Sequence, residues 1–166
     1  MLQGKLFINI KTNKIIIKYY KYSNNGYRNM MINNDFSTYR QIIVTTGLIK
    51  KILSKVSYND NYFIGNLSFL DCIEPDDQYL NIVNQLNESN GKSKKVLIEK
   101  LNMEITELST EKGSDIQSIE VVHRNKTSIT RITLYSNGVL TADTEKYDTV
   151  ELFISDILDG VINESD

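Results

Sequence analysis

The side chains that most often carry enzymatic chemistry are scarce in this sequence. His123 is its sole histidine and Cys72 its sole cysteine. A catalytic triad or a zinc centre needs several such groups within reach of one another. A nucleophilic pair of Cys72 and His123 stays formally open, but Cys72 lies in the apolar run FLDCI, where a thiol is usually buried and inert. The residues therefore predict a protein that is not an enzyme.

Two further motifs resemble ligand sites only in part. Gly91-Lys92-Ser93 resembles the end of a phosphate-binding loop, but the full motif needs a glycine where this chain has Leu86. Acids at four positions between 71 and 77 could hold Mg²⁺ or Ca²⁺. Their spacing is not that of a calcium loop, and acids at a helix N-terminus explain them better. We expect no cofactor and no metal site, and a metal-dependent enzyme built on these acids is the weakest hypothesis.

A basic, tyrosine-rich N-terminal segment is the one feature that could carry binding. Residues 1–56 carry ten basic residues and one acid, a net charge of +9, whereas residues 57–166 carry nine basic and twenty acidic residues, a net charge of −11. Period-two alternation would gather lysines and aromatic rings on one side of a hairpin. The partner-binding face that we expect consists of Lys5, Phe7, Lys11, Lys14, Lys18, Tyr20, Tyr22 and Arg28.

A face of this composition suits two classes of macromolecule. Lysines neutralise phosphates and aromatic rings stack on bases in single-stranded nucleic acid. Tyrosine also offers a large contact area to a protein partner. A third explanation needs no partner: the lysines protect a sheet from aggregation, and the acidic remainder of the chain balances their charge. We favour a protein partner or a homodimer, as in a small inhibitor, immunity or adaptor protein, with single-stranded nucleic-acid binding as the alternative.

Three strands and a helix are expected to position this face. Gly4–Lys11 alternates in hydrophobicity with period two, and Lys14–Ser23 is rich in β-branched and aromatic residues. Asn24-Asn25-Gly26 is typical of a hairpin turn, which makes Tyr27–Ile32 a third strand. Residues 36–46 fit either a helix or a strand over 40–45, and a helix is favoured over 47–56.

The remainder of the chain predicts a central helical pair and a second meander. A strand is expected within 61–73, a helix opening at Glu74–Asp77, and a second helix capped by Ser93. Strands follow at Ile116–Arg124, Thr127–Ser136 and Val139–Thr144. Asp148 and Glu151 have the spacing of a capping box at the start of a final amphipathic helix.

These elements define an α+β class of antiparallel meanders, each followed by an amphipathic helix, in the order βββα-β-αα-βββα. We expect one compact domain over 1–166, with two βββα subdomains at 1–56 and 114–166 as an open alternative. The single cysteine and the lack of a signal peptide or of a run of ~18 apolar residues predict a cytoplasmic protein without a membrane segment. The Ile-, Asn-, Lys- and Tyr-rich composition is typical of AT-rich genomes, including those of many viruses and phages.

Overall fold

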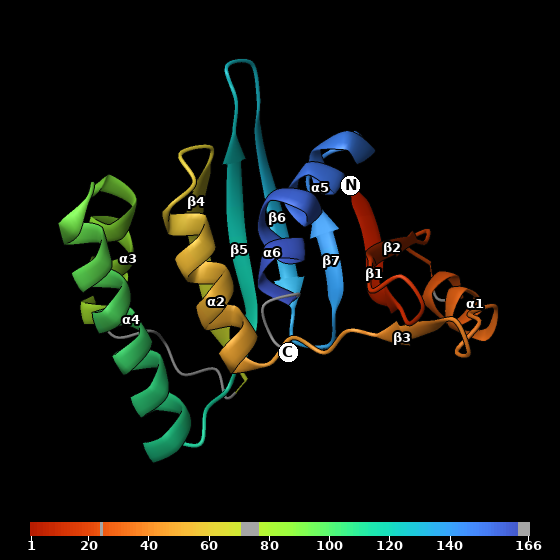
Figure 1. The fold of residues 1–166 in the computed structure, drawn as a ribbon, viewed down its shortest axis with the longest axis horizontal. Coiled ribbons are helices and arrows are strands. Elements are labelled where there is room, and N and C mark those ends of the chain that lie inside the picture. The colour runs from red at the N-terminus through yellow and green to blue at the C-terminus, as the bar shows by residue number, and fades with distance from the viewer. Residues whose placement is uncertain (24, 71–76, 163–166) are drawn as a thin grey trace.

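The protein is built on one seven-stranded antiparallel sheet, seen in a computed structural model that describes residues 1–23, 25–70 and 77–162 (Figure 1). The strands follow the spatial order β2-β1-β7-β6-β5-β4, and β3 also pairs with β1. The predicted α+β class with an antiparallel sheet is confirmed. The strands are β1 (Leu2–Asn9), β2 (Ile15–Tyr19), β3 (Tyr39–Gln41), β4 (Tyr62–Phe69), β5 (Ile116–Arg124), β6 (Ile129–Tyr135) and β7 (Val139–Ala142).

Strand β1 joins the two ends of the sequence within this sheet. Gly4 lies opposite Tyr19 of β2 on one side and opposite Leu140 of β7 on the other. Beyond the end of β7, the same side of β1 pairs with β3 through Phe7–Asn9. The basic N-terminal strands are therefore hydrogen-bonded directly to the C-terminal meander.

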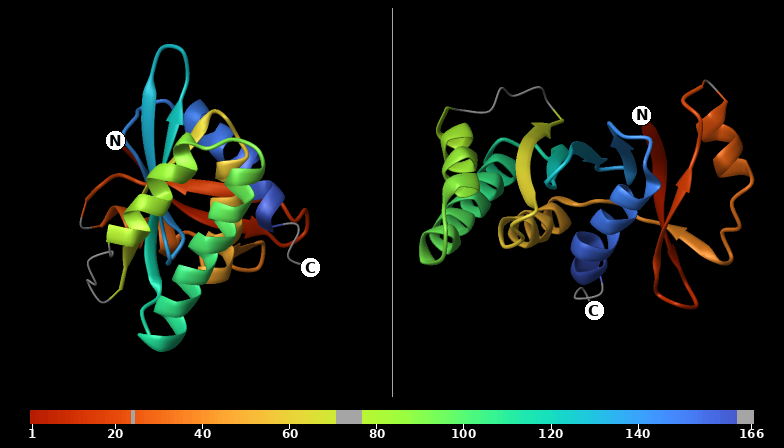
Figure 2. Two further views of the ribbon diagram at one scale, coloured as in Figure 1. Left: turned by 90° about the vertical axis from the view of Figure 1, so that its left-hand side faces the viewer. Right: turned by 90° about the horizontal axis from the view of Figure 1, so that it is seen from above.

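Two helical segments cover one face of the sheet, as Figures 1 and 2 show. Helix α2 (Thr46–Ser57) begins where Thr45 Oγ1 accepts a hydrogen bond from the Leu48 amide at 3.2 Å, and it buries Ile49, Ile52 and Leu53. The second segment runs continuously through α5 (Tyr147–Phe153), the π-helical turn η1 (Ile154–Leu158) and α6 (Asp159–Ile162). Its predicted apolar stripe is buried as expected: Val150, Phe153, Ile154, Ile157, Leu158 and Val161.

Helices α3 (Asp77–Glu88) and α4 (Lys92–Glu111) form the predicted central pair beside β4 (Figure 1). Two of the expected caps were wrong. The N-cap of α4 is Gly91, at a φ of 59°, and Ser93 lies inside the helix; the N-cap of α5 is Lys146, without a side-chain hydrogen bond. Both helices start two residues earlier than a cap at Ser93 or Asp148 would require, so these two residues lie within the first turn.

The third predicted strand was also wrong, because residues 26–32 form the helix α1 (Gly26–Ile32). Ser23 ends the preceding chain segment, and its Oγ accepts a hydrogen bond from the Gly26 amide at 3.0 Å. A Cβ atom on Gly26 would lie 2.0 Å from the Lys21 carbonyl oxygen, so the backbone closes tightly where only glycine fits. The sequence YRNMMI lacks period-two alternation, which leaves it free to form a helix. The observed N-terminal order is therefore ββαβα.

Asn87 of α3 closes the outer edge of β4. Its side-chain amide donates to the Ile64 carbonyl at 2.8 Å, and its Oδ1 accepts from the Ile64 amide at 3.0 Å. These two bonds reproduce the pairing that a neighbouring strand would make. Unpaired strand edges promote aggregation, and this edge is satisfied at its middle.

We predict that Asn87→Ala lowers the free energy of unfolding by about 1–3 kcal/mol, because both backbone groups of Ile64 lose their partner. Urea denaturation checks this value. Asn84→Ala, at an exposed position one turn earlier in the same helix, is the matched control and should change stability by less than ~0.5 kcal/mol. Equal effects of both substitutions would contradict a role for Asn87 in closing the edge.

Candidate partner-binding surface

The hairpin of β1 and β2 brings part of the predicted face together as expected. Lys5 lies opposite Lys18, and Phe7 lies opposite Ile16, in the antiparallel register. Residues directly opposite each other in such a pair point to the same side of the sheet. The predicted period-two arrangement of these four residues is therefore confirmed.

That side of the hairpin is nevertheless covered. Phe7 is fully buried and Lys5 is 2% exposed, and β3 pairs with β1 alongside them through Phe7–Asn9. The Lys18 Nζ donates to Asn34 Oδ1 at 2.5 Å and lies 4.2 Å from the centre of the Tyr39 ring. The expectation of one open basic and aromatic face is thus corrected: Lys5 and Phe7 are buried, and Lys18 is partly buried against Asn34 and Tyr39.

Lys5 serves the sheet internally. Its Nζ donates to the Asn137 carbonyl in the turn between β6 and β7, and burial lowers the pKa of its ammonium group. The same turn is tight, since a Cβ on Gly138 would lie 2.1 Å from the Ile42 carbonyl oxygen. This lysine therefore satisfies a turn carbonyl that the surrounding apolar residues cannot.

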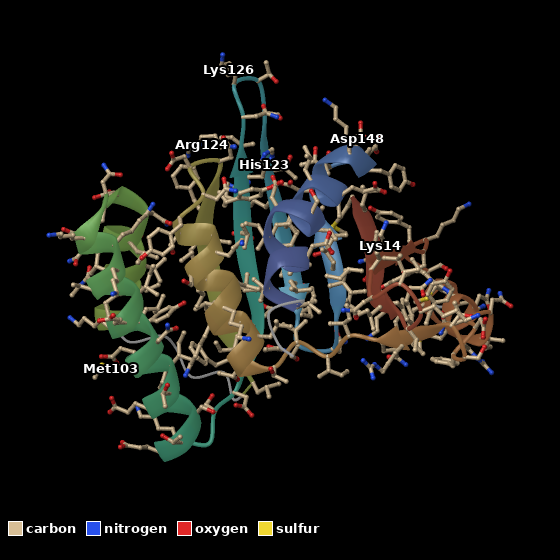
Figure 3. All side chains as sticks on the ribbon, in the orientation of Figure 1. Lys14, Met103, His123, Arg124, Lys126 and Asp148 are labelled. Carbon is tan, nitrogen blue, oxygen red and sulfur yellow. The ribbon has the colours of Figure 1, made fainter. Side chains whose placement is uncertain are left out.

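The other five predicted residues separate into two groups, and all of them are exposed except Tyr20, which is half-buried. Lys11 and Lys14 lie at the β1–β2 turn, where Asn9 Oδ1 accepts the Lys11 amide at 3.0 Å. Tyr20, Tyr22 and Arg28 lie at the opposite end of β2, around its connection to α1. Figure 3 places Lys14 on the side of the molecule that carries these strands and Met103 on the side that carries α4.

The connection between β2 and α1 forms the densest aromatic and basic surface of the N-terminal lobe, which we define as residues 1–41. The rings of Tyr20 and Tyr27 meet edge to face with centres 5.4 Å apart. Tyr22 is 84% exposed, and Lys21 and Arg28 are exposed beside these rings. We call these five residues the β2–α1 cluster.

Helix α1 adds apolar surface that the sequence did not point to. None of its residues is buried, Ile32 is 68% exposed, and Phe36 beyond the helix is 54% exposed. The sequence predicted a strand over residues 27–32, and a strand in the sheet would have buried every second residue of that range. An exposed apolar surface was therefore not expected there. The sequence of α1 has no apolar stripe wide enough to pack on the sheet, and this is the signal that could have predicted its exposed surface.

The positive charge of the lobe is not neutralised within it. The lobe carries seven basic residues and one acid, Asp35, whose carboxylate accepts hydrogen bonds from Ser37 and Thr38. These bonds lower the pKa of Asp35 to about 2. Within the described parts of the chain, Lys21, Arg28 and Arg40 form no ion pair with the C-terminal acids, whereas the positive charge of Lys14 acts on Asp159 and lowers its pKa.

Of the Cys72–His123 pair considered for catalysis, the structure describes His123. His123 is 8% exposed, lies 4.9 Å from the Tyr62 ring, and its Nδ1 has no hydrogen-bond partner among the described residues. Cys72 and the acids at 71–76 lie outside the described residues, and so does the expected helix start at Glu74. In the ranges that the structure describes, no group of three or more potential metal ligands occurs.

Comparisons with protein-family models, with curated proteins and with solved structures found no match for this chain. Among the helices of the described residues, none is long and apolar enough to cross a membrane.

Proposed function

We propose that this protein is a non-enzymatic interaction protein that binds a protein partner through its N-terminal lobe. The observation that carries the proposal is the β2–α1 cluster with the adjoining helix α1. This surface combines exposed tyrosines, an exposed isoleucine and exposed basic side chains, and α1 buries none of its own residues. Tyr and Arg are enriched among residues that dominate binding energy at protein interfaces.

The charge of the lobe specifies the kind of partner. Its basic residues outnumber its acids by seven to one, so an acidic partner surface with an apolar centre is complementary. A small inhibitor, immunity or adaptor protein of the cytoplasm, including one of viral or phage origin, is the class that we favour. The single cysteine in 166 residues supports the cytoplasmic assignment.

Affinity capture from native cell extract tests the proposal. We predict that the variant Tyr22→Ala/Arg28→Ala/Ile32→Ala captures at least tenfold less partner than the unaltered protein, because central aromatic and arginine contacts each contribute about 1–2 kcal/mol or more. Tyr58→Ala/Met103→Ala removes exposed side chains elsewhere and is the matched control, with capture unchanged. Equal capture by both variants, at equal thermal stability, would refute the assignment of this surface.

Single-stranded nucleic acid is the second candidate occupant of the same cluster. The edge-to-face pair of Tyr20 and Tyr27 beside Lys21 and Arg28 offers rings for base stacking and cations for phosphate. Because Lys5 and Phe7 are buried, these two residues cannot contribute to a broad stacking face for bases on the β1–β2 hairpin. Nucleic-acid binding predicts an affinity for oligothymidylate that falls steeply with added salt, whereas protein binding predicts no such affinity.

A further inference from the structure

Strand β2 leaves one edge of the sheet unpaired. The Asn9 amide donates to the Lys14 carbonyl at 2.9 Å, and the Tyr20 amide donates to the Gln3 carbonyl at 3.1 Å. Hydrogen-bonded pairs alternate along an antiparallel ladder, so Ile16 and Lys18 direct their backbone groups toward β1. The backbone groups of Ile15, Ile17 and Tyr19 therefore point away from the sheet, and in the described parts of the chain no residue hydrogen-bonds them.

This edge contrasts with the opposite one. The outer edge of β4 is closed at Ile64 by the side-chain amide of Asn87. Proteins commonly cover or interrupt a strand edge, because an uncovered edge is a template for pairing with another chain. Strand addition to such an edge is also a recurring mode of peptide recognition.

A groove runs beside the open edge. A hollow of about 340 Å³ separates β2 from the C-terminal helical segment and is lined by Ile15, Ile16, Ile17, Glu151, Ile154, Ser155 and Asp159. Ile154 is 7% exposed and contributes an apolar floor. Glu151, Ser155 and Asp159 are four residues apart and so lie along one side of the helix. The open edge therefore has an apolar floor and a wall with a carboxylate toward each end.

The wall carries negative charge in a partly desolvated setting. Burial raises the pKa of Asp159, and the positive charge of Lys14 opposes that rise. Glu151 is exposed at the other end of the wall. The two acids are eight residues apart, roughly 12 Å at the α-helical rise of 1.5 Å per residue and less through the π-helical turn η1, which is close to the ~13 Å that four residues of an extended strand span.

We propose that the β2 edge and this groove bind an extended basic segment of a partner protein as an added strand. Lys or Arg at positions i and i+4 of that segment pairs with Glu151 and Asp159, and an apolar residue at i+2 contacts Ile154. The backbone groups of Ile15, Ile17 and Tyr19 supply the ladder. This inference rests on the proposed function, since it names a second and chemically distinct contact of an interaction protein.

A second copy of this chain fits the groove less well. Pairing two β2 edges would place the acidic walls of both copies on the same face of the joined sheet, where like charges repel. The strand itself would direct Ile15, Ile17 and Tyr19 toward the wall of the other copy, with no cation among them. A foreign segment that alternates basic and apolar residues on that face is complementary in both charge and shape.

Amide hydrogen exchange measured by NMR, with a blocked synthetic peptide as the probe, tests the proposal. The peptide Thr-Lys-Thr-Val-Thr-Lys-Thr should slow exchange at the amides of Ile15, Ile17 and Tyr19 at least tenfold. The amides of Ile16 and Lys18 already bond to β1 and should change little. The peptide Thr-Glu-Thr-Val-Thr-Glu-Thr has the same backbone and should not protect the edge.

A charge-reversed protein provides the matched variant. Glu151→Lys/Asp159→Lys should weaken binding of the lysine peptide at least tenfold. Glu107→Lys/Glu111→Lys makes the same change at exposed positions of α4 and should leave binding unaltered. The variant Tyr22→Ala/Arg28→Ala/Ile32→Ala should retain peptide binding, which separates a failure of the β2–α1 cluster from a failure of the groove.

Four outcomes would overturn the proposal. They are no binding of the lysine peptide at millimolar concentration, binding without protection of the three outward amides, equal binding of the glutamate peptide, and protection of the same amides by self-association alone. The last outcome would assign the edge to a second copy of this chain.

Discussion

Phe7→Ala should lower the free energy of unfolding by about 3–5 kcal/mol. The ring is fully buried, with Nζ of Lys18 in β2 5.3 Å from its centre. Truncation of a buried aromatic ring loses its transfer free energy and leaves a cavity. Chemical denaturation with far-ultraviolet circular dichroism measures the change.

The control for this prediction is Tyr22→Ala, in the same N-terminal segment but 84% exposed, which should change stability by no more than ~0.5 kcal/mol. If residues 4–23 formed an open stacking face, as their alternation suggested, both substitutions would change the free energy of unfolding only slightly. A loss of less than 1 kcal/mol for Phe7→Ala would therefore contradict the burial of this ring.

Lys5→Glu should cost about 3–5 kcal/mol or prevent folding. The Lys5 ammonium is 2% exposed and donates to the Asn137 carbonyl, so a carboxylate there would be buried against an acceptor. A buried charge without a compensating partner is among the most destabilising single changes. Lys11→Glu makes the same substitution in the exposed β1–β2 turn and should be nearly neutral.

The pH dependence of stability provides a second measurement at Lys5, through the milder variant Lys5→Met. Burial lowers the pKa of Lys5 in the folded protein below its ordinary value of about 10.5. Between those two pKa values the unfolded chain binds one more proton than the folded chain, so the contribution of Lys5 to stability rises with pH. Between pH 8 and 10 the unaltered protein should gain stability relative to Lys5→Met. A constant difference between the two proteins across that range would contradict the burial of a titrating lysine.

The sheet was predictable because its strands alternate and its turns carry strong signals. Asn137-Gly138 joins β6 to β7 as expected, with Gly138 at a φ of 76°, where a turn favours glycine. The apolar stripes of α2 and of α5–η1 were predictable because apolar residues recur every three or four positions. This spacing places them on one face of each helix, which packs on the core. The order of the strands was not, since the pairing of β1 with β7 joins residues more than 130 positions apart.

The candidate site was only partly predictable, because a period-two pattern states which residues share a face and not what covers it. Lys5 and Phe7 do share a face with Lys18. The pattern does not show that Lys5 and Phe7 are buried, nor that Lys18 lies against Asn34 and Tyr39. The Asn24-Asn25-Gly26 run resembles a hairpin turn so closely that a third strand was expected where α1 forms. Glycine at 26 is needed for close approach to the Lys21 carbonyl and not for a positive φ, a distinction that the residue type does not show.

The structure shows where some of the basic residues of the N-terminal part and some of the acidic residues of the C-terminal part lie. The side chains of Lys21 and Arg28 are exposed at the β2–α1 cluster, so part of the basic charge of the lobe lies on the protein surface. The acids of the C-terminal helix instead border the groove beside β2.

Site-specific photo-crosslinking in living cells tests the central claim most directly. A benzophenone amino acid replaces Tyr22 in one protein and Tyr58 in another; both tyrosines are exposed, and Tyr58 caps the end of α2 away from the lobe. Binding of a protein through the N-terminal lobe predicts a discrete protein adduct from position 22 that is absent from position 58. The same adducts from both positions, an adduct of nucleic acid alone, or no adduct from position 22 would contradict it.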